Sequence, residues 1–131
     1  CKLFEEGDIL YGRLRPNLNK VFYNNVFHKG ECSTEIIVLK PRTNIVNPVY
    51  LSELLRTETV NKRIVNIVKG AALPRVSMAD LKQLLLPIPP INEQQRIAEQ
   101  VIQKRNELDE HIKRVQQIPV ELSDMLSASF A

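Results

Sequence analysis

The chain has 131 residues, of which 44% are hydrophobic and 25% are charged, and its net charge is +3, as is ordinary for a globular domain. No apolar run approaches the roughly 18 residues of a membrane-spanning helix, and no basic start leads into an apolar segment. We therefore expect a cytoplasmic protein without a membrane segment or signal peptide. Two cysteines and two histidines predict neither a disulfide framework nor a zinc site.

Residues 1–90 are typical of a small α/β (α+β) domain with a mixed sheet and a core of Leu, Ile and Val, since Trp is absent. Runs of β-branched and aromatic residues between turn signals predict short strands at 9–11, 21–23, 26–27, 35–40 and 84–88. The Asn-Pro pair at 47–48 is a helix-start signal, and the spacing after it predicts two consecutive helices that end at Gly70. Ser77 with Asp80 predicts a further short helix.

The stretch Leu86–Ile97, L-P-I-P-P-I-N-E-Q-Q-R-I, joins this domain to a long helix. Its prolines force a stiff, extended segment. Asn92 and a Gln three residues later predict a capped helix start. We assign residues 91–118 to a spacer helix about 40 Å long. Pro119 is expected to break or kink it, which leaves 119–131 as a short terminal helix.

Apolar residues of the spacer helix recur with a seven-residue repeat. A repeat of 3.5 positions per turn favours a coiled-coil seam against a partner helix. The residues expected at this partner-helix interface are Ile97, Val101, Leu108, His111 and Val115. A helix that folds back on its own domain is the plain alternative, and the polar residues Lys104 and His111 in the seam disfavour it.

Charge is unevenly distributed between the two parts. Residues 1–90 carry 13 Lys or Arg and 8 Asp or Glu, whereas residues 91–131 carry 5 and 7. A basic domain on a slightly acidic helix fits nucleic-acid contact by the domain and protein contact by the helix. Because the chain begins at Cys1 rather than Met, we expect it to be a piece of a longer protein.

Residues 13–20, R-L-R-P-N-L-N-K, form the best nucleic-acid candidate. In an extended chain, side chains two positions apart project to one side, as Arg13 and Arg15 are expected to do. Arg matches guanine edges, Asn matches adenine edges and Lys contacts phosphates. The candidate DNA-binding residues of the domain are Arg13, Arg15, Asn17, Asn19, Lys20, Lys69 and Arg75. An ordinary charged loop explains the candidates of residues 13–20 equally well. The helix dipole also favours a cation at Lys69, at the end of the second predicted helix.

No catalytic set stands out. The tetrapeptide N-P-V-Y at 47–50 resembles a motif of amino-methyltransferases, but the four glycines form no G-x-G loop for a methyl donor, and a helix cap explains Asn47. A solvated turn explains Glu5, Glu6 and Asp8. Two rival hypotheses are a small methyltransferase or nuclease using Asn47 or these carboxylates, and a coiled-coil protein-interaction adaptor without DNA binding.

Six segments in order resemble one family, the DNA specificity (S) subunit of type I restriction–modification systems. They are Gly7–Val21, Cys32–Pro41, Asn47–Leu55, Gly70–Leu84, Leu86–Ala98 and Leu122–Ala131. The fifth, L-P-I-P-P-I-N-E-Q-Q-R-I-A, is the most specific. The resemblance covers nearly the whole chain. It implies that the front part of the recognition domain precedes Cys1 and is missing from this chain.

The resemblance implies a target recognition domain followed by a long coiled-coil spacer helix. Such a module reads one half of a bipartite site in double-stranded DNA and is not an enzyme. Its implied partners are methyltransferase (M) subunits, restriction (R) subunits, and a second S half or a second copy of the chain through the spacer helix. The family implies no cofactor in this chain, because S-adenosylmethionine, ATP and Mg belong to the partner subunits.

Overall fold

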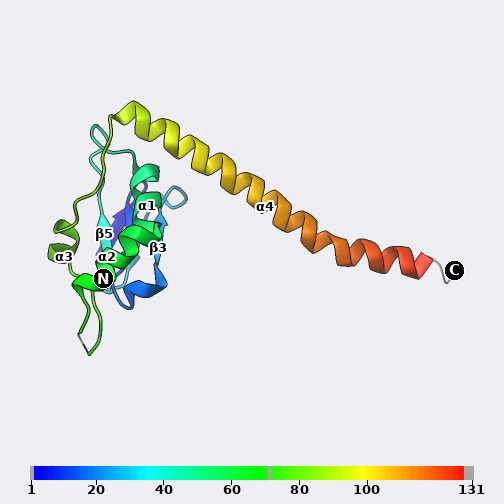
Figure 1. The fold of residues 1–131 in the computed structure, drawn as a ribbon, viewed down its shortest axis with the longest axis horizontal. Helices are drawn as coiled ribbons and strands as arrows, with labels where there is room; N and C mark the ends of the chain where they lie inside the picture. Colours follow the sequence, from blue (N-terminus) through cyan, green and yellow to red (C-terminus); the bar gives the residue numbers. More distant parts are fainter. Residues whose placement is uncertain (1, 71, 129–131) are drawn as a thin grey trace. The chain divides into compact units, whose positions relative to one another are not determined.

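The computed structural model describes residues 2–70 and 72–128 (Figure 1). The strands are β1 (Lys2–Glu5), β2 (Ile9–Gly12), β3 (Val21–Tyr23), β4 (Lys29–Cys32) and β5 (Ile36–Leu39). The helices are the 3-10 helix η1 (Pro16–Leu18), α1 (Pro48–Arg56), α2 (Glu58–Ile67), α3 (Met78–Lys82) and α4 (Ile91–Ala128). The chain divides into two compact units, Cys1–Ala98 and Glu99–Ala131.

The strands of the first unit form two antiparallel sheets. In the three-stranded sheet β2 lies between β3 and β5, so that Ile9 pairs with Tyr23 on one side and Leu39 on the other. The second sheet pairs β1 with β4. Together with the long C-terminal helix, this arrangement confirms the predicted α+β class. The predicted mixed sheet is wrong, because the strand pairs of the described residues are all antiparallel.

One hydrophobic core lies between the three-stranded sheet and helices α1 and α2 (Figure 1). Its buried residues are Ile9, Tyr11, Ile37, Leu55, Val60, Ile64, Val68 and Val76. Leu, Ile and Val dominate the cluster, as the absence of Trp predicts. The two helices meet at Thr57, which ends α1 and accepts the Val60 N–H at the start of α2. The predicted pair of consecutive helices is therefore confirmed.

Two strand predictions are wrong. Residues 26–27 lie in a loop, because the fully buried Asn24 donates to the carbonyls of Glu5 and Phe27 and accepts the Phe27 N–H at 2.9 Å. The strand comes later, as β4. Residues 84–88 run extended without joining a sheet, since Pro87 has no N–H to donate to a ladder.

The start of α4 also differs from the prediction. The helix begins at Ile91, and the Pro90 carbonyl accepts its first bonds, from Glu93 and Gln94 at 2.9 and 3.1 Å. Asn92 therefore lies inside the helix, where its Oδ1 accepts the adjacent Glu93 N–H, and it is not the cap. By contrast, the capping box of Ser77 and Asp80 at α3 is confirmed.

Of the two outcomes predicted at Pro119, the break is wrong, because α4 continues through this residue to Ala128, and the kink stays a prediction. A proline removes one hydrogen bond of the helical ladder, and the remaining bonds carry the helix past it. The assignment of residues 1–90 to a recognition domain stays a prediction. Within the described segments, 2–70 and 72–128, no helix combines the length and the apolar character needed to cross a membrane.

Gln94 holds the first turn of α4 in the first unit. Its side chain is fully buried, Oε1 accepts the Asn47 N–H at 2.8 Å, and Nε2 donates to the carbonyls of Ile45 and Pro89 at 3.0 and 2.7 Å. Nearby, the Tyr50 hydroxyl donates to the Pro87 carbonyl at 2.7 Å. The loop before α1 and the proline segment are therefore fastened together by the beginning of α4.

Replacing Gln94 tests this fastening. Gln94→Met keeps the volume but removes a buried side-chain amide and leaves three backbone groups without their partner, so we expect the free energy of unfolding to fall by about 2–4 kcal/mol in urea denaturation. The matched control is Gln100→Met, at an exposed position of the same helix, with an expected change within about 0.5 kcal/mol. Equal losses for the two variants would contradict the role of Gln94.

The buried hydroxyl of Tyr11 predicts a pH dependence of stability. Burial raises the pKa of Tyr11 to about 12, and the hydroxyl has no hydrogen-bond partner among the described residues. The folded state keeps this proton where the unfolded state releases it, so this contribution to stability is full below pH 10 and is lost as the pH rises from 10 to 12. In the wild type, the free energy of unfolding should fall by about 1.4 kcal/mol per pH unit between pH 10 and pH 12. Tyr11→Phe should remove this fall, and denaturation measured at several pH values in this range checks it. Identical pH profiles for the two proteins would contradict the prediction.

Candidate nucleic-acid interface

The loop between β2 and β3, residues 13–20, has a defined backbone shape. Arg15 and Asn19 lie on either side of η1 and both adopt left-handed backbone angles, with φ of 51° and 52°. The buried Pro16 sits between them, and its carbonyl accepts the Asn61 side-chain N–H from α2 at 2.7 Å. The loop is therefore a fixed platform packed on α2.

Residues 72–76, which precede α3, are tied to this platform by main-chain bonds. The Arg15 N–H donates to the Pro74 carbonyl at 3.3 Å, and the Val76 N–H donates to the Arg13 carbonyl at 2.9 Å. Leu14 and Arg75 form an antiparallel bridge. We call residues 13–20 and 73–76 the tied loops. They bring Arg13, Arg15 and Arg75, which the sequence separates by some 60 positions, onto neighbouring backbone.

The two arginines of the first tied loop have different environments. The half-buried Arg13 donates from Nε to the Val76 carbonyl at 2.9 Å and from a terminal nitrogen to the Thr34 carbonyl at 3.4 Å. The Arg15 side chain is exposed, and no hydrogen bond or ion pair to another described residue holds it. Arg13 thus fastens the loops internally, whereas Arg15 is available to a ligand. DNA contact by either residue stays a prediction.

The two asparagines of the loop also differ. Asn19 donates from Nδ2 to the Arg56 carbonyl at 2.6 Å and so satisfies the C-terminal end of α1, while its Oδ1 is buried without a partner among the described residues. Asn17 is exposed. Lys20 is exposed at its end, and its stem crosses Gly12, where an added Cβ would lie 3.0 Å from it. Asn17 and Lys20 therefore present their polar groups to solvent.

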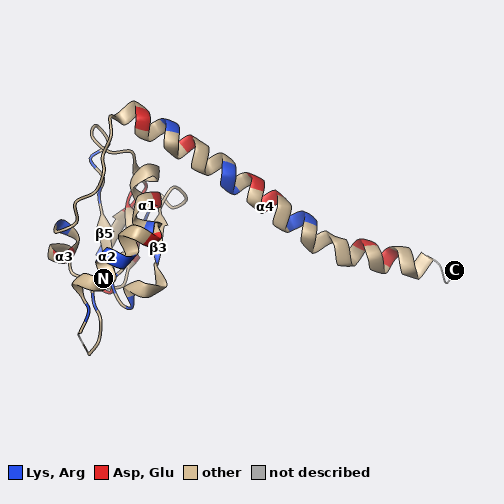
Figure 2. Ribbon diagram, in the orientation of Figure 1, with Lys and Arg blue, Asp and Glu red and all other residues tan. Residues whose placement is uncertain are grey.

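The remaining candidate cations lie on and beside the second tied loop. Arg75 is half-exposed and forms an ion pair with Glu35 at 2.8 Å, and Lys69 is exposed after α2. No Asp or Glu occurs between residues 9 and 30 or between residues 59 and 79. Figure 2 shows Lys and Arg on the loops at the η1 end of the first unit. Positive charge therefore predominates at this end, and the ion pair between Glu35 and Arg75 neutralises part of it.

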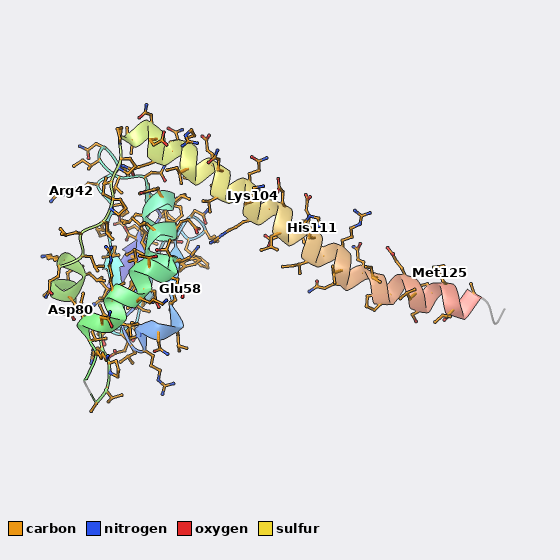
Figure 3. The ribbon with its side chains drawn as sticks, viewed as in Figure 1. Arg42, Glu58, Asp80, Lys104, His111 and Met125 are labelled. Atoms are coloured by element: carbon orange, nitrogen blue, oxygen red, sulfur yellow. The ribbon has the colours of Figure 1, made fainter. Side chains whose placement is uncertain are left out.

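The expected partner-helix residues lie on one stripe of α4. Ile97 and Val101 are half-buried, whereas Leu108, His111 and Val115 are exposed. Sequence reasoning did not include Ile112, which is exposed four positions after Leu108; that spacing was the available signal. Figure 3 shows the side chains of Lys104 and His111 extending from the α4 ribbon. Contact of this stripe with a partner helix stays a prediction.

The residues of the rival enzyme hypothesis have structural roles. Asn47 caps α1 by accepting the Tyr50 N–H at 3.0 Å. Asp8 is buried and accepts both the Glu5 N–H and the Lys40 ammonium, at 2.8 and 2.9 Å. This bond to Asp8 is the main cause that raises the pKa of Lys40. Among residues 2–70 and 72–128, no group of three His, Cys, Asp or Glu side chains could hold a metal ion.

Comparison with known proteins assigns the family. A family model described as the type I restriction modification DNA specificity domain matches residues 1–118. The chain belongs to this family. The specificity-domain match includes both tied loops and most of α4, and it confirms the resemblance noted in the sequence.

Curated relatives agree with this assignment. The specificity domain is 29% identical to the type I restriction enzyme HindI specificity subunit of Haemophilus influenzae over 132 residues, covering 98% of the chain and 28% of that protein. It is also 29% identical to the EcoDI specificity subunit of Escherichia coli over 100 residues, covering 76% of the chain and 21% of that protein. The chain therefore spans less than a third of the length of these relatives.

Solved structures show the same fold. The HsdS subunit from Thermoanaerobacter tengcongensis matches with a TM-score of 0.70 and 25% identity, over 92% of this chain and 30% of that one. A chain from a structure on complex assembly and conformational transition of the type I R-M system matches with a TM-score of 0.69, at the same identity and coverage.

The different environments of Asn17 and Asn19 make a testable pair. Asn19→Ala removes the bond to the Arg56 carbonyl. It also places alanine at a left-handed position, which asparagine tolerates better than alanine does. The free energy of unfolding should therefore fall by about 1–2 kcal/mol. Asn17→Ala, at an exposed position inside η1, should change the free energy of unfolding by less than about 0.5 kcal/mol. Urea denaturation of both variants checks this, and equal stabilities would contradict the structural role of Asn19.

Proposed function

We propose that the chain is a non-catalytic DNA-recognition module of a type I restriction–modification complex, which reads one half of a bipartite site. The observation that carries the proposal is the match of the specificity-domain model over residues 1–118. The geometry supports it, because the tied loops gather cations from two distant parts of the sequence on a rigid platform.

The tied loops offer two kinds of DNA contact. The exposed Arg15 and Asn17 carry the donor and acceptor groups that read base edges. Lys20, Lys69 and Arg75 carry positive charge suited to phosphates, which fixes the position of the domain on the duplex. In this proposal Arg13 acts as a positioning residue, because its guanidinium holds the Val76 and Thr34 carbonyls.

The exposed stripe of α4 supports the proposed protein contacts. We assign the stripe to a partner helix in a second S half or a second copy of the chain. Its residues are Ile97, Val101, Leu108, His111 and Val115. Methyltransferase subunits, with restriction subunits as further partners, would assemble on this scaffold. They would supply S-adenosylmethionine, ATP and Mg, and the complex would act on DNA in the cytoplasm.

A protein-interaction adaptor without DNA binding is the disfavoured alternative. It explains the stripe of α4 but leaves the cationic loops and their carboxylate-free sequence unexplained. Salt separates the two functions, since the logarithm of a DNA affinity falls with the logarithm of salt concentration by about 0.9 per phosphate contacted, whereas an adaptor would not bind DNA.

The direct test uses the full specificity subunit that contains this chain, assembled with its methyltransferase subunits. We expect Arg15→Ala to weaken binding to the cognate duplex more than to a random duplex, with a loss of discrimination of about 1–3 kcal/mol, because a base-edge contact is removed. Fluorescence anisotropy at several salt concentrations measures both affinities.

Arg42→Ala is the matched control, since Arg42 is exposed, like Arg15, and lies in the loop before α1, outside the tied loops. It should leave discrimination unchanged. Equal losses of Arg15→Ala on both duplexes would make Arg15 a phosphate contact. Absence of DNA binding by the wild-type complex at low salt would overturn the proposed function.

A further inference from the structure

Two large apolar side chains are exposed on the tied loops. Leu73 is 75% exposed and Leu18 is 57% exposed, and both stand among the cations described above. We propose that Leu73 and Leu18 contact the bases of bound DNA directly, while the neighbouring cations contact the phosphates. The inference rests on the proposed function and adds an apolar component to how the site is read.

The backbone at both leucines is restrained before any ligand binds. Leu73 precedes Pro74, which confines it to extended conformations, and the Pro74 carbonyl accepts the Arg15 N–H. The Leu18 N–H donates to the Arg15 carbonyl at 2.9 Å within η1. Little conformational freedom is therefore lost when a ligand covers these side chains, and this favours binding.

The surrounding charge identifies the ligand as an anionic polymer with apolar surface. Arg15, Lys20 and Arg75 lie on the same tied loops, and the first loop contains no acidic residue. DNA offers phosphates to these cations, and between its phosphates it offers the thymine methyl group and the faces of the bases. Leucine is among the side chains that DNA-binding proteins insert at base steps.

The position of the loops agrees with this contact. Figure 1 shows the described chain between α2 and α3, on either side of position 71, extending beyond the helices at the end of the first unit where η1 lies. Leu73 belongs to this loop, and the main-chain bonds to Arg13 and Arg15 place the two loops together. An extended loop next to cations can enter a groove that a flat surface could not enter.

An apolar contact and a phosphate contact have different salt signatures. Loss of a phosphate contact lowers the slope of log affinity against log salt by about 0.9, whereas loss of an apolar contact lowers affinity and leaves the slope unchanged. Burial of a leucine side chain corresponds to about tenfold or more in affinity. The two kinds of contact can therefore be separated in one titration series.

The experiment uses the full specificity subunit in complex with its methyltransferase subunits and a duplex carrying the methylation site mapped in genomic DNA. We expect Leu73→Ala to weaken binding about tenfold or more without a change of salt slope, and Leu18→Ala to act in the same direction. Lys20→Ala should instead lower the slope by about 0.9. The control is Leu85→Ala, which is 87% exposed outside the tied loops and should leave affinity and slope unchanged.

Thermal unfolding of each variant checks that the fold is retained, as expected for exposed side chains. Wild-type affinity in both leucine variants would overturn the inference and leave the proposed function intact. A changed salt slope in Leu73→Ala would also overturn it, because the residue would then act through the cations. A wild-type complex that does not bind the duplex would overturn the proposed function itself.

Discussion

The first unit depends on one buried amide, that of Gln94. A neutral amide in a dry site must use its donor and acceptor groups, and Gln94 does so with three backbone partners from the loop before α1 and from the proline segment. The bonded groups of those two segments, at Ile45 and Pro89, lie 44 positions apart in the sequence, and neither belongs to a sheet or a helix. The side chain therefore takes over the role that secondary structure plays elsewhere in the unit.

This interaction explains why two short motifs occur in one chain. The N-P-V-Y tetrapeptide resembles a catalytic motif, yet Asn47 caps α1 with its side chain while its main-chain N–H is bound by Gln94. Tyr50 reaches the Pro87 carbonyl with its hydroxyl. The tetrapeptide and the L-P-I-P-P-I-N-E-Q segment thus form a single joint. The same residue types that position a substrate amine in an enzyme here position a helix.

The sequence predicted elements well where local signals decide them. Asn47 and Ser77 cap helices through bonds to residues three positions away, so their roles follow from spacing alone. It failed where distant partners decide, because β1 and β4 pair across 30 positions and Asn24 bends residues 26–27 out of a strand. Likewise, the pattern selected Asn92 as the cap, while burial against a remote loop gives Gln94 the larger role.

The candidate site was predictable in its composition and not in its assembly. The cationic segment 13–20 is visible in the sequence, but the opposite environments of Arg13 and Arg15 depend on Val76 and Thr34, which approach only in the folded chain. The exposed Leu73 gave no signal, since an apolar residue in a sequence is ordinarily assigned to a core.

The tied loops are joined largely through main-chain amides and carbonyls, together with the anchors Arg13, Asn19 and Asn61. Main-chain bonds do not depend on the identity of the outward-facing side chains, so positions 17, 18, 20 and 73 can vary while the scaffold keeps its shape, and position 15 can vary among residues that tolerate its left-handed backbone. Randomising these five positions and retaining the anchors would give a library of readers on a constant frame. In the proposed function, the same exchange of a few surface side chains would give new target sequences without a new fold.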